Sequence, residues 1–83
     1  PTLVTKDLNM KYMDGSNFTA QTLDSQGKAL ANQTVSFNVN GVFYHKVTNK
    51  DGIASLGIRL MSGEYIITSY WNDFQTGNTI IIS

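Results

Sequence analysis

Cysteine is absent from this 83-residue sequence. Without thiols the chain can form neither a disulfide framework nor a thiolate metal site. A chain of this length buries one small core, which must be stabilised by packing alone. We therefore predict a single domain, residues 1–83, with no cofactor and no metal ion.

Charge is also scarce, with six basic and six acidic side chains making up 14% of the residues. No basic stripe is available to bind phosphates, so we expect neither nucleic-acid binding nor membrane insertion by this domain. No apolar run approaches the ~20 residues of a membrane-spanning helix. Abundant Asn, Thr, Ser and Gly favour the uncharged polar surface of an extracellular β-domain over a cytosolic enzyme.

Helical periodicity is missing too, whereas turn signals recur about every 8–12 residues. This spacing predicts an all-β fold, an antiparallel β-sandwich of Greek-key type with about seven strands. The predicted strands span residues 6–13, 17–24, 33–40, 42–48, 53–60, 64–71 and 78–83.

Alternation along these strands identifies the expected core. Val35, Phe37 and Val39 form the clearest inward-facing set, with polar residues between them. Ile80 and Ile82 repeat the pattern in the last predicted strand. Two facing layers of such residues would make the core of a sandwich.

Turn residues set the connections between strands. Asn40–Gly41 is a strong signal for a two-residue hairpin, and residues 72–77 are predicted to form a longer loop. The run Val42–Thr48 carries apolar residues on both faces. It must therefore be covered on both sides or expose Phe43 or Tyr44.

A corner is predicted where Ser62–Gly63 is followed by Tyr65 at the start of a late strand. A tyrosine there is typical of the tyrosine corner of Greek-key sandwiches, in which the hydroxyl bonds to backbone across the connection. The alternative is an ordinary hairpin in which Tyr65 is only a good strand former. We favour the corner, with Gly63 and Tyr65 as its structural residues.

Four successive stretches carry a family resemblance: Leu23–Leu30, Val35–Tyr44, Thr48–Leu56 and Leu60–Tyr65. In order and spacing they resemble the Ig-like domains strung in tandem in adhesin-like surface proteins of methanogenic archaea. Those domains are distantly similar to invasin/intimin-type bacterial Ig-like repeats. The family usually has proline where this chain has Ser62, and often where it has Ala29. Neither departure alters the expected fold, because proline only pre-organises such turns.

The resemblance covers nearly the whole chain. It implies an Ig-like sandwich, an extracellular cell-surface location, and a role in stalks or adhesion with neighbouring repeats of the same chain as partners. It supplies no catalytic motif and no mapped binding residue. A chain that begins at Pro1 and ends at Ser83, directly out of a predicted strand, also reads as a module of a longer protein.

Catalytic chemistry finds little support. His45 is the only histidine and falls in a predicted strand. A serine triad would require Ser36, Ser55 or Ser69 to meet it, and none of them lies in a nucleophile elbow. We favour a solvent-facing His45 and predict a domain that is not an enzyme.

Acidic residues fall mostly in turns. Asp24, Asp51 and Asp73 would have to gather at one end of the sandwich to bind a cation. Asn49–Gly52 starts like a calcium loop but lacks the later bidentate glutamate. We favour the plain interpretation, in which these side chains cap their own turns.

Two covalent modifications have candidate residues in the sequence, but the isopeptide bond lacks an acid on a predicted inward position. Asn17 and Asn32 each begin an N-glycosylation acceptor pattern, which is also common by chance in a chain rich in Asn and Thr. An internal isopeptide bond would need a buried lysine, Lys6 or Lys11, beside Asn78 with an acid between them.

Aromatic residues outside the expected core are the best candidates to contact a ligand. They are Phe43 or Tyr44, Tyr70, Trp71 and Phe74. Exposed aromatic rings are typical of sugar-stacking surfaces and interface hot spots. The alternative, which we favour, is that Trp71 covers the end of the sandwich and its neighbours pack against the next repeat.

The sequence thus predicts a non-catalytic Ig-like module that acts as a stalk or spacer in cell adhesion. A second hypothesis is that the domain itself binds a glycan or protein on another cell. A third is an accessory β-domain of a secreted enzyme.

Overall fold

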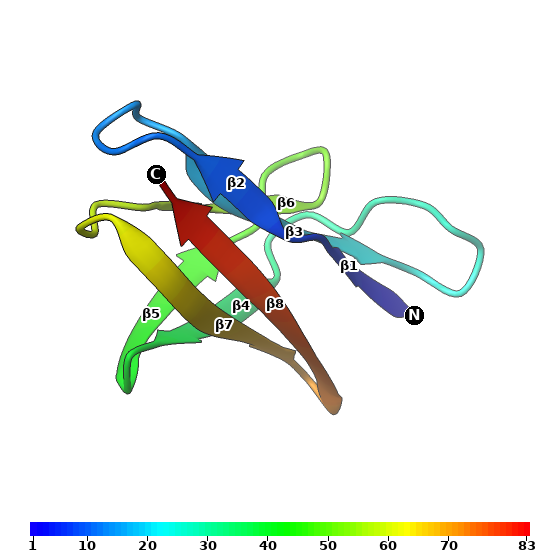
Figure 1. Ribbon diagram of the computed structural model, residues 1–83. Helices are drawn as coiled ribbons and strands as arrows, with labels where there is room; N and C mark the ends of the chain where they lie inside the picture. The colour runs from blue at the N-terminus through cyan, green and yellow to red at the C-terminus, as the bar shows by residue number, and fades with distance from the viewer.

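The computed structural model describes residues 1–83 and contains eight strands and no helix (Figure 1). No segment therefore forms a helix long and apolar enough to cross a membrane. The strands are β1 (Thr2–Thr5), β2 (Leu8–Met10), β3 (Asn17–Leu23), β4 (Thr34–Val39), β5 (Val42–Val47), β6 (Ile53–Gly57), β7 (Gly63–Trp71) and β8 (Phe74–Ile82).

The strands form two sheets around one core. One sheet has the order β1-β3-β6, and the other has the order β2-β8-β7-β4-β5. Every pairing is antiparallel except that of β2 with β8, which is parallel. This two-sheet arrangement confirms the predicted all-β sandwich.

The chain has eight strands rather than about seven because it changes sheets near its start. The predicted strand over residues 6–13 is too long, because only β2 (Leu8–Met10), which pairs with β8, lies within it. β1 (Thr2–Thr5), which pairs with β3 in the other sheet, was not predicted. Lys6 and Asp7 make the crossing between them. One continuous strand cannot pair in both sheets, so the alternation restarts at Leu8.

The core forms where the predicted inward-facing residues meet. Val35, Phe37 and Val39 of β4 are buried, as the alternation predicts. Phe18 of β3 meets Phe37 from the opposite sheet edge-on, with ring centroids 5.8 Å apart at 86°. This geometry is favoured for aromatic pairs and joins the two sheets at their centre.

Both hairpins of the larger sheet use two-residue turns. Asn40 and Gly41 have φ of 53° and 80°, as expected for the predicted hairpin between β4 and β5. The predicted loop over residues 72–77 is wrong. Asn72 and Asp73 alone make that turn, and β8 already begins at Phe74.

The segment between β3 and β4 is fixed by hydrogen bonds to buried threonines. The hydroxyls of Thr22 and Thr48 donate to the Leu30 carbonyl at 2.9 and 2.8 Å. Leu30 is half-buried and packs against the core. Gly52 packs beside this junction with φ of 72°, and a Cβ there would lie 2.7 Å from the Thr22 carbonyl oxygen. Only glycine fits such an approach.

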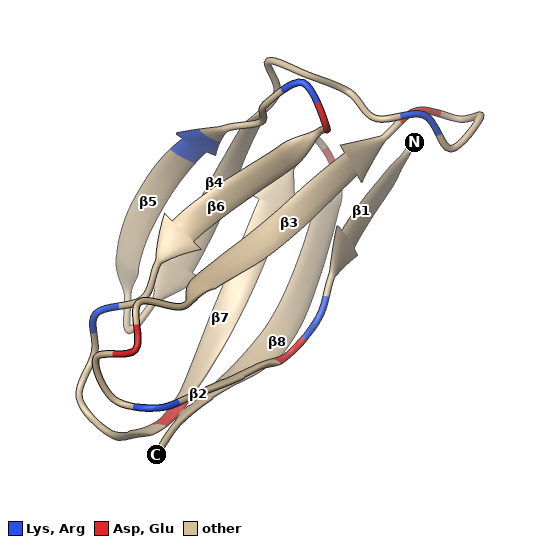
Figure 2. Ribbon diagram, turned by 90° about the horizontal axis from the view of Figure 1, so that it is seen from above, with Lys and Arg blue, Asp and Glu red and all other residues tan.

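Most charged side chains belong to loops at the two ends of the sandwich, whereas Lys6 and Asp7 lie at its side, in the crossing beside β8 (Figure 2). Of the six basic and six acidic residues, only Lys46 in β5 and Glu64 in β7 belong to strands. The broad faces of the sheets are therefore made almost entirely of uncharged side chains.

Candidate functional site

An aromatic pair lies on the face of the five-stranded sheet that is turned away from the core, here called the outer face. Phe43 of β5 and Tyr70 of β7 contact each other across β4, with ring centroids 6.1 Å apart. Phe43 opposes Asn38 and Tyr70 opposes Ser36, two β4 residues that alternate with the buried ones. Phe43 is 55% exposed. The predicted candidates Phe43 and Tyr70 thus come together at the surface.

Uncharged polar side chains flank this aromatic pair on the outer face: Ser36, Asn38, His45, Thr68 and Gln75. Ser36 Oγ lies 2.8 Å from His45 Nδ1. Hydroxyl, amide and imidazole groups beside aromatic rings can hydrogen-bond a neutral ligand while the rings contact its apolar surface.

Trp71 and Phe74 lie on the opposite side of the same hairpin, facing the core. The hypothesis that Trp71 is a ligand-facing residue outside the core is therefore wrong, and its burial agrees with the favoured alternative, in which Trp71 packs against the sandwich. Trp71 is only 3% exposed. It stacks on the half-buried Phe74, with centroids 5.7 Å apart at 19°. Its indole Nε1 donates to Gln33 Oε1 at 3.2 Å. Trp71 shares its parity with Ile67, a signal for burial that the sequence already contained.

The corner before β7 has the geometry of a tyrosine corner. The Tyr65 hydroxyl donates to the Met61 carbonyl at 2.7 Å, four residues upstream. Gly63, which lies between them, has φ of 152°. A Cβ added to Gly63 would lie 3.8 Å from the ring of Tyr65. Both residues act in the fold rather than at the outer face.

The structure brings His45 to one of the three serines considered for a triad, Ser36, across the β4–β5 ladder. No carboxylate hydrogen-bonds to His45, and both residues lie on the open outer face. Ser55 and Ser69 lie on other strands, and Ser69 is buried. A pair of this kind orients the imidazole and adds a polar contact beside Tyr70.

Of the turn carboxylates of Asp24, Asp51 and Asp73, only that of Asp24 accepts hydrogen bonds within its own turn. Asp24 Oδ1 accepts the N–H groups of Gln26 and Lys28 at 2.8 and 2.9 Å. The prediction that Asp51 and Asp73 cap their turns is wrong, because Asn49 Oδ1 caps the turn that contains Asp51. No three His, Cys, Asp or Glu side chains lie close enough together to hold a metal ion. Asp24 therefore caps its own turn, as the plain interpretation predicted.

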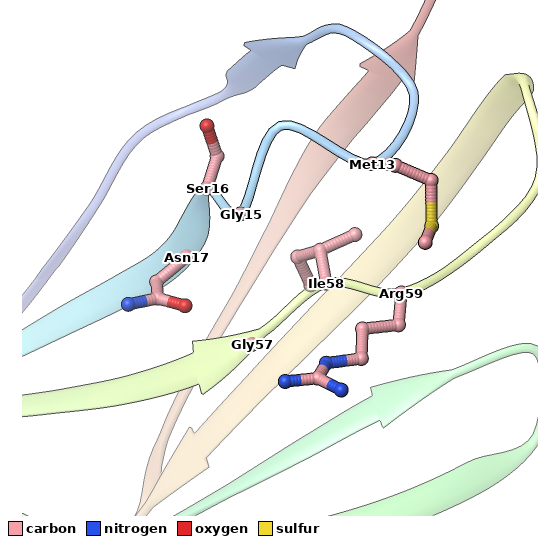
Figure 3. Close-up of a pocket in the computed structure, with 7 residues that line it drawn as sticks. All are labelled: Met13, Gly15, Ser16, Asn17, Gly57, Ile58 and Arg59. Atoms are coloured by element: carbon pink, nitrogen blue, oxygen red, sulfur yellow. The ribbon is translucent and has the colours of Figure 1, made fainter.

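Two shallow pockets lie near the ends of β5 and β6. The first, of about 240 Å³, is lined by the loop before β3 and by Gly57, Ile58 and Arg59 after β6 (Figure 3). The second, of about 330 Å³, lies between β5 and β6, and Val42 and Tyr44 contribute to its mostly apolar lining. Arg59 borders both and is the one charged side chain in either.

The candidate residues for an isopeptide bond do not have the required arrangement. Lys6 and Lys11 are both exposed, whereas the bond needs a buried lysine. Asn78 instead donates its Nδ2 to Asp7 Oδ1 at 3.1 Å, and the Thr79 N–H donates to the same oxygen at 3.0 Å. The bond from Thr79, and then that from Asn78, lower the pKa of Asp7.

Asp7 is a structural residue that no local pattern in the sequence marks. Its carboxylate attaches the crossing between β1 and β2 to β8. Asp14 instead accepts hydrogen bonds from Lys11 and Ser16 within its own loop after β2. The Ser16 hydroxyl and the N–H groups of Lys11 and Ser16 lower its pKa.

Both candidate glycosylation sites lie at the surface. Asn17 begins β3, and Asn32 precedes β4 with φ of 59°. Both side chains are exposed, so neither acceptor is blocked by burial.

Comparison with known proteins adds no further information about this site, because no protein-family model and no curated protein matches the chain. The arrangement of strands and the chemistry of the outer face therefore carry the functional argument.

Proposed function

We propose that this domain is a non-catalytic, extracellular Ig-like module of an adhesin-like cell-surface protein, in which it acts as a load-bearing spacer. The observation that carries the proposal is the parallel pairing of β2 with β8, the last strand. The two termini lie at opposite ends of a molecule 38 Å long, in both Figure 1 and Figure 2.

Tension on the termini would load this ladder in shear. Force applied before β2 and after β8 pulls two parallel strands in opposite directions along their length, so that their hydrogen bonds must fail together. The ladder extends beyond the strands, because the Ser83 N–H donates to the Met10 carbonyl and the Tyr12 N–H donates to the Ser83 carbonyl, at 3.0 and 2.9 Å. A spacer under load benefits from this geometry.

Force spectroscopy on a tandem polyprotein of this domain tests the proposal. Each domain should unfold in one step and release roughly 250 Å of chain, from 83 residues less the folded length of 38 Å. Tyr12→Pro removes a ladder donor and should lower the unfolding force. Asn9→Pro is the matched control. The backbone groups that bond to Ser83 belong to Met10 and Tyr12, so the N–H of Asn9 points away from β8 and its loss removes no bond of the ladder.

Equal forces for Tyr12→Pro and Asn9→Pro would contradict the shear mechanism. So would unfolding of the wild-type domain without a resolvable force peak.

A second candidate function is favoured by the contact between Phe43 and Tyr70. The outer face around them is uncharged, which suits a neutral, hydroxyl-rich glycan better than an ionic ligand. A glycan array probed with the isolated domain tests this candidate. Tyr70→Ala should abolish any specific signal, whereas Ile66→Ala, an exposed residue of the same strand and face, should leave it unchanged.

A further inference from the structure

β5 is one of the two edge strands of the five-stranded sheet, the other being β2. All six of its residues are exposed, among them Val42, Phe43 and Val47 at 51, 55 and 60%. Figures 1 and 2 both show β5 at the margin of the molecule, next to β4 alone within its sheet. Edge strands are usually protected by charge, proline or a covering segment. β5 has only Lys46 as protection, so it is suited to pair with another strand.

The hairpin with β4 determines which backbone groups of β5 are free. In a two-residue hairpin the residues that flank the turn, Val39 and Val42, form a hydrogen-bonded pair, and such pairs then alternate along the ladder. The N–H and C=O groups of Phe43, His45 and Val47 consequently point away from β4. Three donors and three acceptors are available along the edge.

We propose that β5 pairs antiparallel with β5 of a second copy of this chain, with His45 opposite His45 across a two-fold axis. This register pairs each free residue of one strand with a free residue of the other, so all six free groups of each strand are used. Phe43 then lies opposite Val47 on the outer face, twice in the dimer. Aromatic and β-branched residues form favourable cross-strand pairs.

The charge on Lys46 favours the same register. Centred on His45, the pairing places Lys46 opposite Tyr44, whose ring and hydroxyl can receive the ammonium group. A register centred on Lys46 would put two like charges opposite each other, and one centred on Tyr44 would leave Val47 without a partner in β5. Each of these alternatives pairs only two of the three free residues.

The interface is short. Six residues span about 20 Å of strand, less than a standard protein interface, so the dimer should be reversible and dependent on concentration. Pairing would join the two outer faces into one continuous sheet and associate two modules side by side. This inference goes beyond the spacer function, and its test on the single domain does not depend on mechanical strength.

Sedimentation equilibrium over a concentration series is the first test. The wild-type mass should rise from 9.2 kDa toward twice that value. Val47→Lys should weaken the dimer about tenfold, because it removes both apolar Phe43–Val47 pairs. Ile66→Lys is the matched control: Ile66 is 61% exposed, as Val47 is 60%, and lies on the outer face of an inner strand. This control should dimerise like the wild type.

Cysteine cross-linking tests the register, because the chain has no cysteine of its own. His45→Cys should form a disulfide-linked dimer under mild oxidation, since residues directly opposite in such a pair have Cα atoms about 5.5 Å apart. Val47→Cys should not cross-link, because it would face Phe43 rather than its own equivalent. A wild-type chain that stays monomeric up to about 1 mM, or equal cross-linking of the two variants, would overturn the proposal.

Discussion

Tyr65 stabilises one end of the sandwich through a single hydrogen bond whose two partners are four residues apart. Its hydroxyl reaches the Met61 carbonyl in the connection that brings the chain from β6 to β7. The ring packs partly against the core at the same time. One side chain therefore orders the connection and covers the core beside it, which is the role of a tyrosine corner.

Removing this hydroxyl should destabilise the domain without affecting its outer face. We expect Tyr65→Phe to lower the free energy of unfolding by about 1 kcal/mol, because the ring stays and only the hydrogen bond is lost. Urea denaturation followed by tryptophan fluorescence measures the change. Tyr70→Phe is the control, since the Tyr70 hydroxyl makes no hydrogen bond within the chain. An unchanged midpoint for Tyr65→Phe would show that the corner bond contributes nothing.

The residue-level signals available in the sequence differ in kind. The corner could be predicted because Gly63 and Tyr65 are close in the chain and the bond is local. Asp7 could not be identified, because its partners Asn78 and Thr79 lie more than 70 residues away and nothing local marks them as neighbours. Its role depends on where the crossing passes β8.

At the level of elements, the β7–β8 hairpin separates two kinds of aromatic residue. Trp71 and Phe74 point inward and stack, whereas Tyr70 points outward to Phe43. Adjacent residues of one strand thus have different tasks, because successive side chains face opposite sides of a sheet. The four aromatic candidates divide into a core pair and a surface pair.

This division predicts opposite effects for two neighbouring substitutions. Trp71→Ala should cost about 3–5 kcal/mol of stability, because it removes a large buried ring and leaves Gln33 without its donor. Tyr70→Ala should cost less than about 1 kcal/mol, because Tyr70 is only half-buried and its ring contact lies at the surface of the sheet. Thermal or chemical denaturation followed by circular dichroism measures both. A similar loss for the two variants would contradict the assignment of faces.

The errors made from sequence also belong to this level. Two dipeptides have the composition of a turn, Asn72–Asp73 and Thr76–Gly77. The long-range pairing of β8 decides between them: the chain turns at Asn72–Asp73, whereas Gly77 lies within β8, opposite Thr68. The split between β1 and β2 left a faint signal, since the inward parity changes from Leu3 to Met10. Alternation predicted the core and the sandwich well. It could not predict register, which is set by partners distant in the chain.

At the level of the whole molecule, most charges lie in the loops, and the strands carry only Lys46 and Glu64. The two carboxylates with altered titration, Asp7 and Asp14, are both in the loops that flank β2. Each accepts hydrogen bonds from N–H groups or hydroxyls that require the folded chain. The attachment of β2, and with it the proposed shear ladder, is therefore linked to their ionisation.

Acid should weaken the fold through these two groups. Their pKa values are lowered in the folded chain, so the unfolded chain binds more protons as the pH falls below its ordinary carboxyl pKa of about 4. The contribution of these two carboxylates to stability is therefore complete above the unfolded-chain pKa of about 4. It declines as the pH falls through their lowered pKa values in the folded chain. We expect the melting temperature to drop between about pH 5 and pH 2.

Two double variants test this origin of the acid sensitivity. Asp7→Asn/Asp14→Asn should show a shallower drop in melting temperature. Asp51→Asn/Asp73→Asn removes two carboxylates that make no hydrogen bonds, so it should follow the wild-type curve. Identical pH profiles for both double variants would show that the hydrogen bonds around β2 do not couple protonation to folding.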